Sequence, residues 1–155
     1  MHPKRFALIA GILMVLTGVL AFVPSLNVMP TADMPALNVN NSYGLFLGYI
    51  PWNVLNKIAL IAFGAAGIAA SQFPATNLPA SIRWSRIIFA VMGVLAILGL
   101  IPQTNTLGGY MPLFGWGIVS HAVASVLGAY FGFALTSRVP DQKMAPKQSH
   151  VAGVR

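Results

Sequence analysis

Residues 6–24 read FALIAGILMVLTGVLAFVP, a stretch without a single charged side chain. An α-helix rises about 1.5 Å per residue, so a segment of this length is close to what is needed to cross the roughly 30 Å hydrocarbon core of a bilayer. Three further apolar segments follow, at about 52–71, 82–101 and 114–136. Together they predict an all-α fold, an integral membrane four-helix bundle made of two tandem helical hairpins.

The composition supports a membrane protein over a soluble one. Hydrophobic residues make up 57% of the 155 residues, and charged residues only 7%, whereas about a quarter of a soluble domain is charged. High hydrophobicity also excludes an intrinsically disordered chain. The third segment has an unbroken apolar core only at 87–101, and we expect Arg83 and Arg86 to extend its span by reaching to the interface.

The basic residues predict the orientation of the chain. Eight of the nine Lys and Arg residues lie before the first segment, between the second and third, or after the fourth: Lys4, Arg5, Arg83, Arg86, Arg138, Lys143, Lys147 and Arg155. The alternate loops, 25–51 and 102–113, contain one charged residue, Asp33. The positive-inside rule then places both termini in the cytoplasm, and we expect a bacterial inner or intracytoplasmic membrane. This distribution favours membrane lipids as partners and not nucleic acid.

The two halves of the chain resemble each other. Gly64 and Gly128 match at an offset of 64 residues, and the second and fourth segments both follow an approach rich in Gly, Pro and aromatic residues. We therefore predict one transmembrane domain, 1–137, built as a tandem repeat, with irregular outer loops and a flexible basic cytoplasmic tail at 138–155.

Small residues recur along the second and fourth helices. The predicted helix-packing positions are Ala62, Ala66, Gly67, Ser120, Ala124, Gly128 and Gly132. Small side chains let helix backbones approach closely in lipid. Two interpretations are open: packing within this bundle, or packing against another membrane protein or a second copy of the chain.

His121 is the one histidine inside an apolar segment, and ionisable residues within a membrane are candidates for function. Lys57, Asn56 and Ser125 lie at a similar depth, so these four residues could form a polar ligand-binding cluster on the outer side. In the alternative interpretation, His121 is neutral and bonded to a neighbour, Asn53 caps the second helix, and Lys57 anchors it at the interface or pairs with Asp33.

The sequence offers little catalytic chemistry. There is no Glu and no Cys, and the two Asp residues are predicted on opposite sides of the membrane. No phosphate-binding loop, G-x-S-x-G or H-E-x-x-H motif is present. We therefore expect no catalytic residues, no metal site, no cofactor and no enzymatic activity.

Two stretches carry a family resemblance. Residues 51–56 (PWNVLN) with 64–71 (GAAGIAAS), and residues 109–115 (GYMPLFG) with His121 and 129–133 (AYFGF), resemble the signatures of the bacterial domain-of-unknown-function family 4383. The resemblance covers about residues 5–135 and implies a four-helix membrane fold without an established activity. In that family the positions of Asn56 and Leu60 are often histidine, so the resemblance implies no shared histidine site here.

The function predicted first is a non-enzymatic accessory or scaffold protein that packs against other membrane proteins. The alternative is a small transporter or binder of an apolar ligand, such as a lipid, quinone or pigment, that uses the outer polar cluster.

Overall fold

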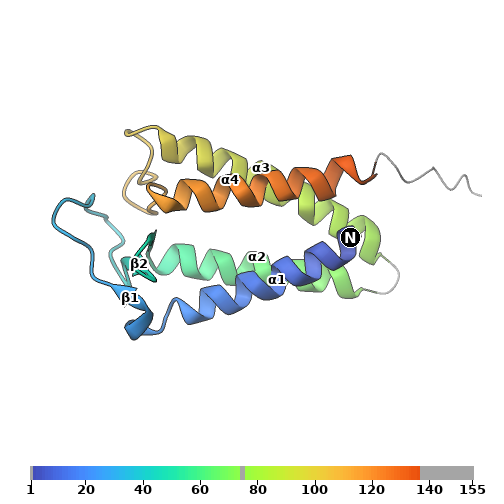
Figure 1. Cartoon of the computed structure of the whole chain (residues 1–155), viewed down its shortest axis with the longest axis horizontal. Helices are drawn as coiled ribbons and strands as arrows, with labels where there is room; N and C mark the ends of the chain where they lie inside the picture. Colours follow the sequence, from blue (N-terminus) through green and yellow to red (C-terminus); the bar gives the residue numbers. More distant parts are fainter. Residues whose placement is uncertain (1, 74–75, 137–155) are drawn as a thin grey trace, which may run out of the picture.

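The computed structural model describes residues 2–73 and 76–136 and consists mainly of four helices (Figure 1). They are α1 (Pro3–Leu20), α2 (Val54–Gln72), α3 (Asn77–Leu100) and α4 (Trp116–Ala129), which continues through a π-helical turn, η2 (Tyr130–Ala134). Each is long and apolar enough to cross a membrane when α4 and η2 are taken together. The fold is therefore the predicted all-α membrane four-helix bundle. The predicted tail, 138–155, lies outside the described residues.

The largest difference from the predicted helix boundaries is at the start of the third helix. That helix was predicted from residue 82, but α3 begins at Asn77 and has 24 residues. It is therefore about 36 Å long, and no arginine is needed to extend a short span. Pro79 makes this start hard to predict from the sequence, because a proline usually interrupts a helix. In the first turn it is tolerated, since its missing N–H would have had no partner there.

The loop between α1 and α2 contains more regular structure than the irregular chain predicted. After a short 3₁₀ turn, η1 (Pro24–Leu26), three very short strands form an antiparallel sheet in the order β1-β2-β3: β1 (Asn27–Val28), β2 (Gly44–Phe46) and β3 (Ile50–Trp52). Strands of two or three residues are too short to show an alternating pattern in the sequence. The sheet lies beside the start of α2 (Figure 1). This end of the bundle, with the loops 21–53 and 101–115, is called the loop end below.

Each hairpin is held by a close approach of its two helices. A Cβ atom added at Gly64 of α2 would lie 2.6 Å from the carbonyl oxygen of Gly11 in α1. One added at Gly128 of α4 would lie 2.6 Å from the backbone nitrogen of Phe89 in α3. These distances are shorter than van der Waals contact, so only glycine fits at both positions. Gly64 and Gly128 thus perform the same role in their two hairpins, as the tandem repeat predicts.

The two hairpins meet at the opposite end of the bundle, which holds the N-terminus and is called the terminal end. The rings of Phe6 and Phe131 stack with their centroids 4.2 Å apart, and the Trp84 ring lies 5.8 Å from that of Phe6. The indole N–H of Trp84 also donates a hydrogen bond of 3.0 Å to the backbone oxygen of Phe63. Aromatic packing and this bond therefore fix α3 and η2 against α1 and α2.

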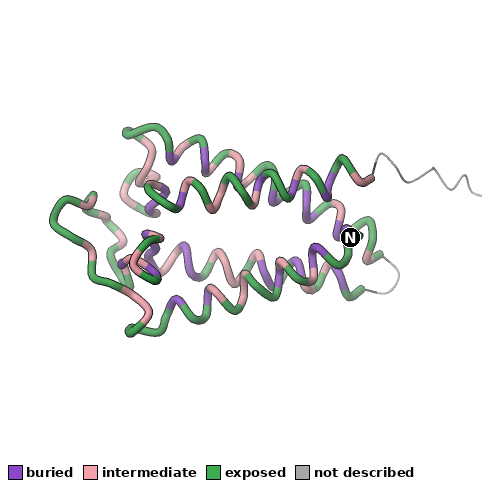
Figure 2. The backbone as a smooth tube through the Cα atoms, viewed as in Figure 1, coloured by how far each residue is buried: buried purple, intermediate pink, exposed green. Residues whose placement is uncertain are grey.

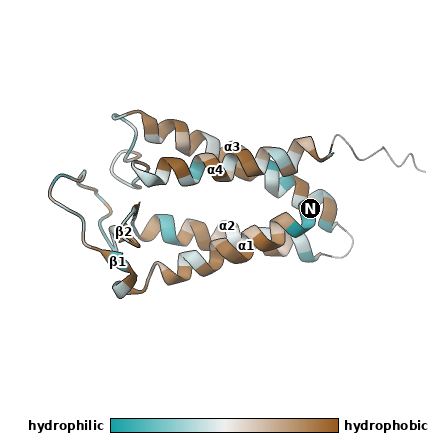
Figure 3. Cartoon of the chain, in the orientation of Figure 1, coloured by the Kyte–Doolittle hydropathy of each residue, from teal (hydrophilic) through white to brown (hydrophobic). Residues whose placement is uncertain are grey.

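The outer surface of the bundle is apolar, and several polar side chains are buried. Leu16 and Val126 are 54% and 68% exposed, whereas Lys57 is 1% exposed. Exposed residues run along the outer sides of the helices (Figure 2), where hydrophobic residues predominate (Figure 3). A protein that folds in water does not usually expose such large apolar faces. The surface is suited to lipid, in which a helix satisfies the hydrogen bonds of its own backbone and needs no water.

Candidate ligand-binding cavity between the hairpins

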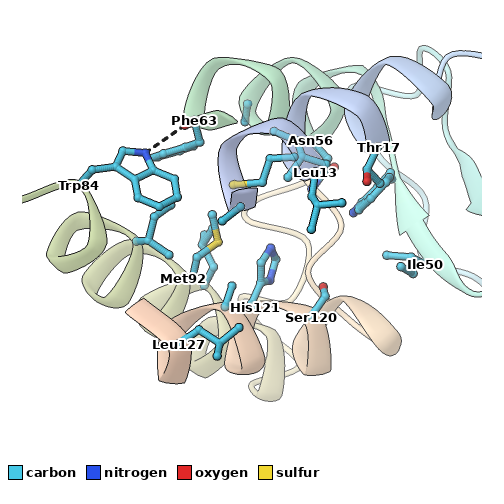
Figure 4. A pocket seen from close by; sticks show the side chains of 18 of the residues that line it. Leu13, Thr17, Ile50, Asn56, Phe63, Trp84, Met92, Ser120, His121 and Leu127 are labelled. Carbon is cyan, nitrogen blue, oxygen red and sulfur yellow. Dashed lines mark hydrogen bonds between the residues drawn. The ribbon is translucent and has the colours of Figure 1, made fainter. Parts of the chain in front are cut away.

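A cavity of about 360 Å³ separates the two hairpins. Its walls come from all four helices, from β3 and from the loop between α3 and α4 (Figure 4). The lining residues are Phe6, Ala10, Leu13, Met14, Thr17, Ile50, Trp52, Asn56, Ala59, Leu60, Phe63, Trp84, Ile88, Met92, Leu95, Met111, Ser120, His121, Ala124 and Leu127. None of these side chains is a carboxylate, a lysine or an arginine. The volume is within the 300–1,000 Å³ typical of small-molecule sites.

His121 contributes the polar atom that most distinguishes this cavity. Its imidazole extends from α4 into the space between the hairpins, toward Leu13 and Met92 (Figure 4). The Nδ1 atom is buried and has no hydrogen-bond partner within the described part of the chain. A buried polar group left without a partner costs roughly 1–3 kcal/mol. Nδ1 itself is shielded from the cavity, so a ligand would remove that cost by bonding to it after the imidazole ring has rotated.

The helical repeat of α4 explains why His121 faces inward. Ser125, Gly128 and Gly132 lie four, seven and eleven positions further along, so they share one face of the helix with His121. The hydroxyl of Ser125 donates to the backbone oxygen of Phe89 (2.9 Å), and Gly128 and Gly132 also contact α3. At the level of His121, this face of α4 borders the space between the hairpins and not α3, so the His121 side chain lines the cavity.

The other polar residues of the cavity are already engaged or carry only hydroxyls. The Asn56 side-chain oxygen accepts a bond from the backbone N–H of Asn53 (3.2 Å), and its amide nitrogen donates to the oxygen of Pro112 (3.4 Å). The Ser120 hydroxyl donates to Gly117 (2.9 Å), which leaves its oxygen free to accept. Thr17 adds a second hydroxyl. A ligand therefore meets the imidazole of His121, two hydroxyls and the indole of Trp52 in otherwise apolar surroundings.

The structure divides the predicted polar cluster. His121 and Asn56 line the same cavity, whereas Lys57 and Ser125 do not. The Lys57 ammonium donates to the backbone oxygen and the hydroxyl of Ser42 (2.8 and 2.7 Å) and lies 5.5 Å from the centre of the Phe22 ring. Adjacent helical residues are about 100° apart, so Asn56 and Lys57 cannot both face the cavity.

The alternative prediction for Lys57, a pair with Asp33, is not observed either. Asp33 is in the exposed part of the outer loop, where a hydrogen bond from the Thr31 side chain holds the pKa of its carboxyl below the usual range. Lys57 instead fastens that loop to α2 through Ser42. The predicted N-cap is present, because the Asn53 side chain accepts bonds from the backbone N–H groups of Leu55 and Asn56.

Asn53 also has a role that the sequence did not indicate. Its amide nitrogen donates to the backbone oxygens of Val39 (2.8 Å) and Tyr110 (2.6 Å), which belong to the two long loops. The side chain is completely buried. One residue thus caps α2 and ties both loops together over the cavity. Only the capping pattern is local enough to be recognised from the sequence.

The predicted small-residue positions fall into three groups. Gly67, Gly128 and Gly132 make close contacts within the bundle; a Cβ at Gly67 would lie 2.7 Å from the Trp84 ring. Ser120 and Ala124 line the cavity. Ala62 and Ala66 are exposed on the outer side of α2, so packing within the bundle does not account for them.

A second, more open hollow of about 770 Å³ adjoins the cavity on its α1–α4 side. Its own lining residues are Tyr49, Trp116, Val119 and Val123. It shares Leu13, Ile50, Ser120, Ala124 and Leu127 with the cavity. This side groove, as it is called below, is almost entirely apolar and opens between α1 and α4, on the surface suited to lipid.

Among the described residues, no group of three or more His, Cys, Asp or Glu side chains is placed to hold a metal ion. The arrangement is that of a multi-pass helical membrane protein with an apolar cavity inside the bundle. Residues 4–134 match the sequence model of the domain of unknown function DUF4383, and the chain belongs to this family. No curated protein and no solved structure matches the chain.

Proposed function

We propose that this protein is a non-enzymatic membrane protein that binds a neutral, largely apolar ligand from the bilayer between its two hairpins. The observation that carries the proposal is the unpartnered Nδ1 atom of His121 in a cavity whose other walls are mainly apolar. Binding sites of this kind combine a hydrophobic lining with a few polar groups that orient the ligand. For this reason we prefer the ligand-binding function to the scaffold function that the sequence favoured.

The lining of the cavity supports a neutral ligand. A charged group in an apolar interior needs an opposite charge or several hydrogen bonds. No lining residue is an acid, a lysine or an arginine, and the ammonium of Lys57 is bonded to Ser42 outside the cavity. An alcohol, a phenol or a carbonyl meets these conditions, whereas a phosphate or a free carboxylate does not.

Mass spectrometry of the protein extracted from its native membrane tests the proposal. The wild type is expected to retain a neutral apolar compound at close to one molecule per chain. His121→Leu is expected to retain less, because the polar anchor is lost. Val126→Leu is the matched control, since Val126 is on the same helix but 68% exposed. Equal retention by all three proteins, or no retained compound in any, would contradict the proposal.

A second candidate function is the scaffold. The observation that favours it is the exposure of Ala62 and Ala66 on the outer side of α2, where Ala65 and Ala69 are also exposed. Such a face can approach a helix of another membrane protein or of a second copy of this chain. Crosslinking in the membrane tests it: Ala66→Leu should reduce crosslinked species, and an unchanged pattern would argue against packing on this face.

The proposed setting is a bacterial inner or intracytoplasmic membrane, with the terminal end in the cytoplasm. Lys4 and Arg5 are in the first turn of α1, and Arg83 and Arg86 are in the first half of α3, so four cations belong to this end of the bundle. The loops of the opposite end contain Asp33. Reporter fusions at the N-terminus and within the 25–51 loop should give opposite locations.

A further inference from the structure

The cavity and the side groove lie next to each other. They share residues of α1, β3 and α4, and the shared α4 positions, Ser120, Ala124 and Leu127, separate the inner part from the outer part. α1 packs against α2 and α3, and α4 packs against α3, but α1 and α4 have little contact with each other along their length. The bundle is therefore open on the α1–α4 side.

The two ends of the bundle are closed. At the terminal end, Phe6 stacks on Phe131 with their ring centroids 4.2 Å apart, and Trp84 packs beside them. At the loop end, Trp52 and Met111 cover the cavity, and Asn53 bonds both long loops above it. A ligand consequently reaches His121 from the side, out of the lipid, and not from the aqueous phase at either end.

The inner part of this space suits a compact ring. Trp52, Phe63 and Trp84 provide aromatic surfaces, against which a planar ring packs in offset or edge-to-face geometry. Met14, Met92 and Met111 add flexible thioethers, which fill irregular gaps and contact ring edges favourably. The larger side groove offers an almost entirely apolar surface, so it suits an extended hydrocarbon chain.

The imidazole of His121 can serve both redox forms of one ligand class. In a neutral imidazole, Nδ1 carries the proton in one tautomer and a lone pair in the other. It can therefore donate to the carbonyl of a quinone or accept from the hydroxyl of a quinol. Both forms are uncharged, as the lining requires.

Building on the proposed binding function, we infer that the ligand is a quinone or quinol with a long apolar tail. Its ring occupies the cavity beside His121, and its tail leaves through the side groove between α1 and α4. Ala124 and Ser120 form the narrow passage between the two parts. Exchange of the ligand with the bilayer takes place along the same route.

The three tryptophans of the chain make this arrangement measurable. Trp84 lines the cavity and Trp116 lines the side groove. The full-length protein is placed in phosphatidylcholine nanodiscs as two variants, Trp52→Phe/Trp116→Phe to retain Trp84, and Trp52→Phe/Trp84→Phe to retain Trp116. A benzoquinone with a decyl tail should quench Trp84 saturably. The same probe with a terminal bromine on the tail should add quenching at Trp116 and not at Trp84.

A matched pair of alanines on α4 tests the passage. Ala124→Phe fills it, whereas Ala122→Phe places the same ring on an exposed position outside both hollows. Ala124→Phe should weaken binding of the decyl probe about tenfold, and Ala122→Phe should leave it unchanged. Ser120→Leu provides a second way to narrow the passage if Ala124→Phe does not fold.

The outcomes separate this inference from the proposed function. Saturable quenching by the probe that is equally strong in Ala124→Phe and Ala122→Phe would overturn the side route, and additional bromine quenching at Trp84 would overturn the orientation. If the decyl quinone does not bind saturably while a neutral compound of another class is retained from the native membrane, the quinone assignment fails and the binding function stands. If neither binds, both fail.

Discussion

Replacing His121 by leucine should stabilise the ligand-free protein. The Nδ1 atom is buried without a partner among the described residues, and the surrounding lining is mainly apolar. Removing an unsatisfied buried group recovers roughly 1–3 kcal/mol. Leucine also adds apolar contacts in a space that has room for it. We therefore expect the free energy of unfolding to rise by about 1–2 kcal/mol, the lower part of that range, because the cavity remains incompletely filled.

Asn56 provides a control with the opposite expected sign. It lines the same cavity, but its side-chain oxygen accepts from Asn53 and its amide nitrogen donates to Pro112. Asn56→Leu removes both bonds and leaves their buried partners unpaired, at a cost of roughly 1–3 kcal/mol. Two substitutions of a polar residue by leucine in one cavity should thus change stability in opposite directions.

Unfolding by sodium dodecyl sulfate in mixed micelles, followed by tryptophan fluorescence, measures both effects on protein stripped of bound lipid. The stabilisation by His121→Leu should accompany a loss of ligand retention, as expected when a residue serves binding at the expense of stability. If His121→Leu lowered the free energy of unfolding by 1 kcal/mol or more, His121 would have a structural partner. The interpretation of the cavity as a binding site would then be refuted.

Three further predictions concern the framework around the cavity. Gly64→Ala should destabilise the bundle by about 1–3 kcal/mol, since its Cβ would lie 2.6 Å from the Gly11 oxygen. Its control is Gly117→Ala, which should be neutral or stabilising by up to about 1 kcal/mol, because nothing lies within 4 Å of the added Cβ. The same micelle titration compares the two variants. Asn53→Ala should cost about 2–4 kcal/mol, because it removes a helix cap and two bonds to the loops; an unchanged midpoint would show that the loops are held by other contacts. Lys57→Met should release the outer loop from α2, since the bonds to Ser42 are lost. Limited proteolysis within residues 29–43 should then become faster, while ligand retention stays unchanged. A loss of ligand retention would show that Lys57 belongs to the binding site.

Much of the fold could be predicted from local patterns in the sequence. Four long apolar runs specify four helices, the Asn53 cap marks the start of α2, and the offset of Gly64 and Gly128 identifies the crossing point of each hairpin. The predicted start of α3 was wrong because a proline is permitted in the first turn of a helix, where Pro79 lies. The sequence alone does not show whether a proline is in a first turn or interrupts a helix.

The cavity itself could be predicted only in part. In a membrane protein, the residues that line a cavity and those that face the bilayer are equally apolar. Hydropathy therefore does not show which face of a helix points inward. Met92, which is buried and lines the cavity, is as apolar as Leu16, which is exposed, so hydropathy does not separate the two residues. Only the polar residues indicate which face of a helix is turned away from lipid, and on this basis His121 and Asn56 were predicted to line a site. Lys57 and Ser125 were grouped with them by depth, although their helical phase directs them to Ser42 and Phe89.

We have proposed that the space between the hairpins is a binding site for a lipid-derived ligand. An experimental structure of the protein purified from its native membrane, without added ligand, tests this most directly. Non-protein density is expected beside the imidazole of His121, continuing between α1 and α4 along Ala124 and Leu127. Hairpins closed upon each other, with Nδ1 bonded to a protein group and no space between Leu13 and Leu127, would contradict it.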